Sequence, residues 1–136
     1  MGYTERRNLN RGYMKLEVWN EAMTLFKWVF KTTESIHGID FKLRSQIINA
    51  AQSVSGNIAE GYWRRSINEY LQFLNVAIGS SGELMTRMIG LKVAGLIQQE
   101  TFETFDMMHY SAENKLLALV KSIQGKRNKG DWLEEF

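Results

Sequence analysis

The stretch NIAEGYWRRSINE, residues 57–69, predicts where one helix ends and the next begins. Ser66 followed by Glu69 fits a capping box, in which the hydroxyl accepts from the third N–H group of the helix and the carboxylate reaches back to the cap. Gly61 suits the end of the preceding helix, because glycine readily adopts the left-handed conformation that often terminates helices. We therefore expect a corner between two antiparallel helices here.

Glu60 stands in the last turn before this corner. A carboxylate there opposes the helix dipole at a cost of about 0.3–1 kcal/mol, so we expect Glu60 to have a partner. The free N–H groups at the start of the next helix are within reach. We interpret one set of residues as the structural joint: Asn57, Glu60, Gly61, Ser66 and Glu69. The remaining residues of the corner would point outward from this joint: Tyr62, Trp63, Arg64 and Arg65.

Apolar residues recur at spacings of three and four on both sides of the corner, which is typical of amphipathic helices. This periodicity predicts helices at about 14–36, 41–60, 67–94 and 98–124. Long helices joined by short connections form antiparallel bundles. We therefore expect an all-α, up-down-up-down four-helix bundle over residues 14–125, with a basic arm at 1–13 and a charged tail at 126–136.

Other turns must come from residues other than proline, because the chain has none. Asp40 is placed to cap the second helix, and Gly95 and Gly125 are placed to end the third and the fourth.

The first predicted helix carries two apolar stripes. One stripe is Leu16, Trp19, Met23, Phe26 and Phe30, and the other is Val18, Ala22, Leu25 and Val29. One bundle core rarely needs so broad an apolar arc. We therefore expect part of it to face a second subunit.

The composition is that of a single globular domain, with 136 residues, 44% hydrophobic and 24% charged. No apolar run reaches the 18 or more residues of a membrane span, and the N-terminus lacks the apolar core of a secretory signal. Cysteine is absent, which excludes disulfides and thiol chemistry. We expect a cytoplasmic protein without a membrane partner. The net charge of +2 does not by itself indicate a nucleic-acid binder.

The sequence GSSG at residues 79–82 approaches a hydrolase motif but lacks the Gly-x-Ser-x-Gly spacing and lies inside a predicted helix. A glycine inside a helix costs about 1 kcal/mol relative to alanine, so we expect a packing reason for it. Antiparallel pairing places Gly79 opposite Ala50 and Ala51, where the two backbones would approach closely. We expect no catalytic residue and no enzyme activity.

Two motifs have the spacing used in di-iron bundles, Glu34-x-x-His37 and Asp106-x-x-His109. His37 falls in a turn, whereas His109 falls well inside the last helix, so their levels differ by roughly 15 Å. We expect no metal site and no cofactor, and we interpret His109 as a core histidine.

The same antiparallel pairing predicts two structural ion pairs. It brings Arg44 near Glu83, and Arg87 near Asp106. Removing one partner of a buried pair typically costs about 3–5 kcal/mol.

In this topology the start of the first helix, the corner and the end of the last helix lie at one pole. Basic residues gather there: Arg6, Arg7, Arg11, Lys15, Arg64, Arg65, Lys121, Lys126, Arg127 and Lys129. With the rings of Tyr62 and Trp63 they indicate a nucleic-acid grip, because looped or single-stranded RNA is bound through stacking and phosphate contacts. The alternative is that the aromatic rings plug the end of the bundle and the arginines are solvated.

The chain resembles the four-helix bundle family of 23S ribosomal RNA intervening-sequence proteins over about residues 14–124. The resemblance is carried by Val18-Trp19, Ala22, the run Asn57-Ile58-Ala59-Glu60-Gly61, Ser66, Glu69, Phe73, Leu74, Ala77, Gly79, Ser80 and Glu83. That family is similar to the accessory variability determinants of diversity-generating retroelements. It often has proline in the place of Ser55, where a helix would kink.

The resemblance implies a homopentameric barrel and no catalytic residue. For the retroelement members it implies partners that are RNA or DNA and a reverse transcriptase. We expect a non-enzymatic oligomer that binds structured RNA or a ribonucleoprotein through the basic pole. The alternative hypothesis is a protein–protein interaction scaffold that binds no nucleic acid.

Overall fold

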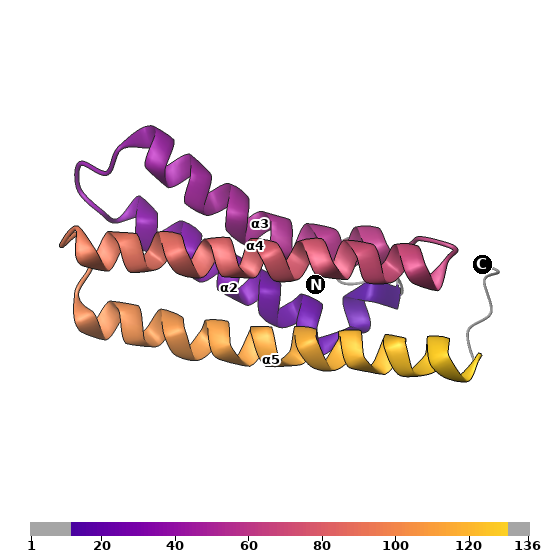
Figure 1. Cartoon of the computed structure of the whole chain (residues 1–136). Helices are drawn as coiled ribbons and strands as arrows, with labels where there is room; N and C mark the ends of the chain where they lie inside the picture. The colour runs from indigo at the N-terminus through magenta and orange to yellow at the C-terminus, as the bar shows by residue number, and fades with distance from the viewer. Residues whose placement is uncertain (1–11, 131–136) are drawn as a thin grey trace, which may run out of the picture.

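The computed structural model describes residues 12–130, which form one short 3₁₀ helix and four long α-helices without a strand. These are η1 (Gly12–Lys15), α2 (Glu17–Glu34), α3 (Phe41–Tyr62), α4 (Ile67–Val93) and α5 (Gln99–Lys129). The long helices run alternately up and down, and α2 contacts α3 and α5 while α4 contacts the same two (Figure 1). The predicted all-α four-helix bundle is confirmed. No helix within residues 12–130 combines the length and apolar character needed to cross a bilayer.

Two predicted N-terminal caps are present. The Asp40 carboxylate accepts from the N–H of Leu43 at 2.9 Å, at the start of α3. The Ser66 hydroxyl accepts from the N–H groups of Asn68 and Glu69 at 3.2 and 3.4 Å, at the start of α4. Each cap supplies an acceptor to backbone donors that have no partner within their own helix.

The helix ends at glycines were predicted correctly once and wrongly twice. Gly95 follows α4 with a φ of 77°, in the left-handed region. Gly61 and Gly125 instead lie inside α3 and α5, because neither adopts a positive φ and both helices continue past them. Helix α5 ends at Gly130, whose φ is 69°. The basic residues that we placed in a charged tail therefore belong to the last turn of α5: Lys126, Arg127 and Lys129.

The first predicted helix is split at Leu16, whose extended backbone (ψ 126°) separates η1 from α2. The core side of α2 is the stripe of smaller residues: Val18, Ala22, Leu25, Val29 and Thr33. The larger stripe remains partly exposed, with Met23 at 38% and Phe30 at 37%. Large side chains have therefore been left at the surface of α2.

The core consists of two clusters of buried side chains, one toward each end of the bundle. The cluster near the α3–α4 corner includes Val18, Ile58, Leu74 and Leu116, and the other includes Val29, Ile47, Met88 and Phe105. Full burial of one such side chain contributes about 1.5–3 kcal/mol. Every long helix supplies residues to both clusters, so the bundle packs as one unit.

The contact between α3 and α4 is made by small residues, but not by Gly79. Gly79 is exposed, and a Cβ built on it would meet nothing within 4 Å, so Gly79 itself is not packed against α3 as we predicted. The neighbouring Ser80 hydroxyl lies 2.7 Å from that of Ser53 on α3. Ala77 and Ser81 occupy the buried face of α4, and Gly79, two residues from each, points to the other side.

Both predicted ion pairs are wrong. Arg44 donates to the Thr33 hydroxyl and the Phe30 carbonyl oxygen of α2, each at 3.1 Å, instead of reaching Glu83. Arg87 donates to Gln46 at 3.0 Å and pairs with Glu83, four residues earlier in its own helix, at 3.4 Å instead of reaching Asp106. The contacts Ser53–Ser80 and Gln46–Arg87 show an α3–α4 register that differs from simple pairing about the corner, which displaces Glu83 from Arg44. Arg87 misses Asp106 for another reason, because its side chain is directed to α3 instead of α5.

Helix α3 is continuous through Ser55, and its ribbon changes direction along its course although the chain has no proline (Figure 1). The Ser55 hydroxyl donates to the Gln52 carbonyl at 3.3 Å, and the Asn57 amide donates to the Ser53 carbonyl at 2.7 Å. Side chains that bond back to helix carbonyls favour such bends.

Candidate nucleic-acid interface

The α3–α4 corner, η1 and the end of α5 lie at the same pole of the bundle (Figure 1). Arg127 in the last turn of α5 donates to the side-chain oxygen of Asn68 at the start of α4, at 3.4 Å. This bond places the last turn of α5 beside the start of α4. Arg6, Arg7 and Arg11 lie outside the described residues.

The 3₁₀ helix η1 docks on this corner through Gly12. A Cβ on Gly12 would lie 1.7 Å from the hydroxyl oxygen of Tyr62 and 2.3 Å from Cζ of its ring, so a larger residue here would require η1 or the Tyr62 ring to shift. The next residue, Tyr13, places its ring edge-on to Trp19, Tyr62 and Trp63, with centroids 5.4, 6.3 and 6.3 Å away. The sequence did not indicate a role for Gly12 or Tyr13, because a single glycine or aromatic residue in a polar segment gives no periodic signal.

The two predicted stacking residues have different roles. Tyr62 is half-buried beneath Gly12 and packs edge-on against Tyr70, with ring centroids 6.2 Å apart. Trp63 is 57% exposed, with its ring nearly perpendicular to that of Tyr62 at 88°. Burial, with a smaller effect of Tyr62, raises the pKa of Tyr70 to about 12. Tyr62 thus belongs to the packed base of the corner, and Trp63 is its outward face.

The two arginines of the corner also differ. The Arg64 guanidinium lies 4.5 Å from the centre of the Phe73 ring, and its Nη2 is 3.4 Å from Oε1 of Glu60. Its buried Nε has no hydrogen-bond partner among the described residues. Glu60 therefore has a partner, but that partner is Arg64 instead of the expected N–H groups of α4. Arg65 is exposed to solvent.

The remaining basic side chains of the described pole are exposed: Lys15, Lys121, Lys126, Arg127 and Lys129. The acidic residues nearby are Glu17, Glu60 and Glu69. Two of these three are at least partly neutralised, because Glu60 pairs with Arg64 and Glu17 pairs with Lys115 at 3.2 Å. The described part of the pole therefore has an excess of positive charge, which attracts polyanions.

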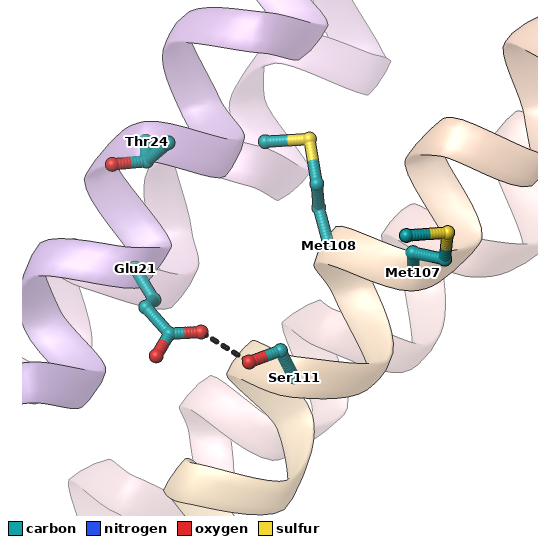
Figure 2. Close-up of a pocket in the computed structure, with 5 residues that line it drawn as sticks. All are labelled: Glu21, Thr24, Met107, Met108 and Ser111. Carbon is teal, nitrogen blue, oxygen red and sulfur yellow. Dashed lines mark hydrogen bonds between the residues drawn. The ribbon is translucent and has the colours of Figure 1, made fainter.

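A pocket of about 310 Å³ lies between α2 and α5, away from the basic pole (Figure 2). The Ser111 hydroxyl donates to Oε1 of Glu21 at 2.5 Å, and Lys115 Nζ lies 2.5 Å from Oε2. Burial acts to raise the pKa of Glu21, but the bonds from Lys115 and Ser111 outweigh it and lower that pKa. Both carboxylate oxygens are engaged and the group is ionised at neutral pH, so Glu21 ties α2 to α5.

The buried His109 is held by Ser81 of the GSSG stretch. Its Nε2 lies 2.8 Å from the Ser81 carbonyl oxygen and 2.9 Å from the Ser81 hydroxyl. Both residues are at most 5% exposed, which agrees with the core histidine that we predicted. Within residues 12–130, no group of three or more His, Cys, Asp or Glu side chains is arranged to hold a metal ion.

Residues 14–118 match the model of the family described as 23S rRNA-intervening sequence protein. The matched segment includes the α3–α4 corner and most of α5, but ends before the basic last turn of that helix. No curated protein matches the chain.

Proposed function

Because the chain belongs to the 23S rRNA-intervening sequence protein family, we propose that it is a non-enzymatic, oligomeric helical bundle that binds structured RNA or a ribonucleoprotein in the cytoplasm. One observation carries this proposal. The exposed Trp63 and Arg65 share a pole with the basic last turn of α5 and with Lys15 of η1.

This surface combines the two chemistries that RNA binding uses. Lysine and arginine side chains bind phosphates and release counterions, which supplies affinity with little sequence dependence. An exposed indole can stack on a base that is not already stacked in a helix. Lys126, Arg127 and Lys129 are on the last turn of α5, Lys15 is on the docked 3₁₀ turn, and Arg65 is in the short connection between α3 and α4, which limits their spacing.

Assembly would strengthen the binding. The partly exposed stripe on α2, which includes Met23 and Phe30, supports contact with a second copy, since exposed apolar residues often mark interfaces. A ring, which we expect to be a homopentamer, would repeat the basic pole in each subunit and raise the avidity for a long RNA. In a diversity-generating retroelement, this assembly would serve as an accessory factor of the reverse transcriptase.

The test is binding of a fluorescently labelled hairpin RNA at several salt concentrations, starting at about 50 mM. Arg65→Ala with Lys126→Ala is expected to weaken binding and to reduce the slope of log affinity against log salt by about 1.4. The matched control is Lys31→Ala with Lys42→Ala, two exposed lysines at the opposite pole. Arg64 is unsuitable because it packs on Phe73. Undetectable binding by the wild type, or equal loss in both variants, would rule out the proposal.

A second candidate function is a protein-interaction scaffold without nucleic-acid binding. It is favoured by exposed apolar side chains away from the basic pole, notably Val93 at 80% and Met107 at 74%. Purification from cells distinguishes the two functions. A scaffold would retain its protein partners after nuclease treatment and would contain no protected RNA.

A further inference from the structure

Trp63 is the C-terminal cap residue of α3 and stands at the surface of the corner. The residue is 57% exposed, yet two rings are packed against its indole. The Tyr62 ring lies 5.9 Å away at 88°, and the Tyr13 ring lies 6.3 Å away at 73°. Both arrangements are edge-to-face, which aromatic rings prefer at these distances. The side chain is therefore supported from two sides while much of it remains open to solvent.

One of the two supports comes from outside the four long helices. Tyr13 belongs to η1, which contacts α2 and α3 and lies against the Tyr62 ring at Gly12. Tyr13 also packs against Trp19 of α2, so that η1 is held between α2 and the corner. The contact of Tyr13 with Trp63 thus exists only while η1 is docked.

We propose that Trp63 is a stacking platform for an unpaired base, and that Gly12 and Tyr13 are positioning residues that restrict the orientation of its indole before RNA binds. This inference rests on the proposed RNA binding and specifies its ligand as a looped or single-stranded segment. A base within a duplex is already stacked on both faces, so an exposed indole can stack only on an unpaired one. The exposed Arg65, two residues further on, is near enough along the chain to contact the adjoining phosphate.

Docking of η1 affects affinity because it removes freedom from Trp63 before RNA arrives. Immobilising a side chain on binding costs about 0.5–1.5 kcal/mol, which corresponds to about 2- to 12-fold in affinity. A base–aromatic stack contributes about 1–3 kcal/mol, which corresponds to about 5- to 150-fold. Removing Trp63 should therefore reduce the affinity more than removing its support does. Both changes should weaken binding of the same class of RNA.

The experiment compares two RNAs of equal length, a hairpin with an unpaired loop and a fully paired duplex, at one fixed salt concentration. Trp63→Ala is expected to weaken hairpin binding about 5- to 150-fold. Tyr13→Ala and Gly12→Ala are each expected to weaken it about 2- to 12-fold. Tyr13→Phe keeps the ring and should bind like the wild type. Trp63→Ala and Tyr13→Phe should bind the duplex as the wild type does, because they leave the phosphate contacts unchanged. Tyr13→Ala and Gly12→Ala also move Lys15 with η1, so for these two the loss on the hairpin should exceed the loss on the duplex.

Gly12→Ala is the more specific of the two support variants, because it keeps every aromatic ring in the chain while its Cβ overlaps the Tyr62 ring, so that η1 or that ring must shift and the support of Trp63 changes. Its matched control is Gly82→Ala on α4, where a Cβ meets nothing within 4 Å. Fluorotryptophan labelling adds a measurement without RNA. The ¹⁹F signal that disappears in Trp63→Ala should shift or narrow in Tyr13→Ala and Gly12→Ala, but not in Gly82→Ala.

The outcomes separate this inference from the proposed function. If the wild type binds neither RNA, both fail. If it binds RNA and Trp63→Ala is unaffected, or hairpin and duplex lose affinity equally, only the platform fails. If Trp63→Ala is impaired but the two η1 variants bind normally and leave the ¹⁹F signal unchanged, the positioning role fails. Far-UV circular dichroism verifies folding, and Tyr13→Leu replaces Tyr13→Ala should the latter unfold.

Discussion

The backbone of Gly61 on α3 lies directly against Tyr70 on α4. A Cβ on Gly61 would be 3.2 Å from the Tyr70 carbonyl oxygen, 3.0 Å from its ring and 2.9 Å from Cβ of Phe73. None of these is the far end of a flexible side chain, so α3 or α4 would have to shift. The glycine is required for the approach of two helices, and not for ending one.

We therefore expect Gly61→Ala to lower the free energy of unfolding by about 1–3 kcal/mol, the usual cost of overpacking. The measurement is urea unfolding at a fixed protein concentration, because assembly would couple stability to concentration. Gly79→Ala is the matched control. Its Cβ meets nothing within 4 Å, so the gain in helix propensity should raise stability by about 0.5–1 kcal/mol. Equal effects of the two substitutions would contradict this account.

The sequence was sufficient to predict the bundle because its helices repeat one apolar spacing and two of their caps have strong signatures. Asp40 and Ser66 were identified from residue type and position alone, and both accept the expected backbone hydrogen bonds. Long periodic segments average over many residues, so errors at single positions do not alter the number or direction of the helices.

Contacts between helices were not predictable in the same way. The partners of Arg44 and Arg87 depend on axial register, and a shift of a few residues along a helix replaces every expected partner. The two stripes of α2 have the same spacing, so periodicity could not show that Val29 is buried while Phe30 is 37% exposed. The docking of Gly12 on Tyr62 is a contact between segments distant in sequence, without a periodic pattern to indicate it.

The network around Glu21 predicts a component of acid sensitivity. The folded-state pKa of Glu21 is lowered below its ordinary value of 4.5, since the bonds from Lys115 and Ser111 outweigh burial. The stability contributed by ionised Glu21 is fully present above pH 4.5 and is lost as the pH falls below it through the folded-state value. Glu21→Gln should therefore reduce the difference in unfolding free energy between pH 7 and pH 3.

The control for this prediction is Glu34→Gln, which removes an exposed carboxylate from the same helix. It should leave the pH dependence close to that of the wild type. Urea unfolding of the three proteins at half-unit intervals of pH measures the effect. A Glu21→Gln curve parallel to the wild-type curve would show that the carboxylate contributes nothing through its charge.

The raised pKa of Tyr70 predicts a loss of stability at alkaline pH. Burial, and then the neighbouring Tyr62, raise its pKa from 10.0 to about 12. Below pH 10 the phenol is neutral in both the folded and the unfolded state, so its titration costs no stability there. Above pH 10 the phenol ionises more readily in the unfolded state, which favours unfolding. Stability is lost as the pH rises from 10 toward 12, by up to about 3 kcal/mol. Tyr70→Phe should remove this part of the alkaline slope, which urea unfolding between pH 9 and 11.5 measures.

The exposed stripe on α2 predicts the effect of a charge on assembly. Met23 is 38% exposed and lines a groove of about 230 Å³ between α2 and α3, together with Trp19 and Phe26. If this stripe contacts a second copy, Met23→Glu would bury an unpaired carboxylate in the interface, which is strongly unfavourable. We expect the mass in solution, measured by light scattering, to fall toward that of one chain.

The control is Thr86→Glu, which adds the same charge at an exposed site on α4 and should leave the mass unchanged. A wild type that is already monomeric, or a Met23→Glu variant of unchanged mass, would remove α2 from the proposed interface.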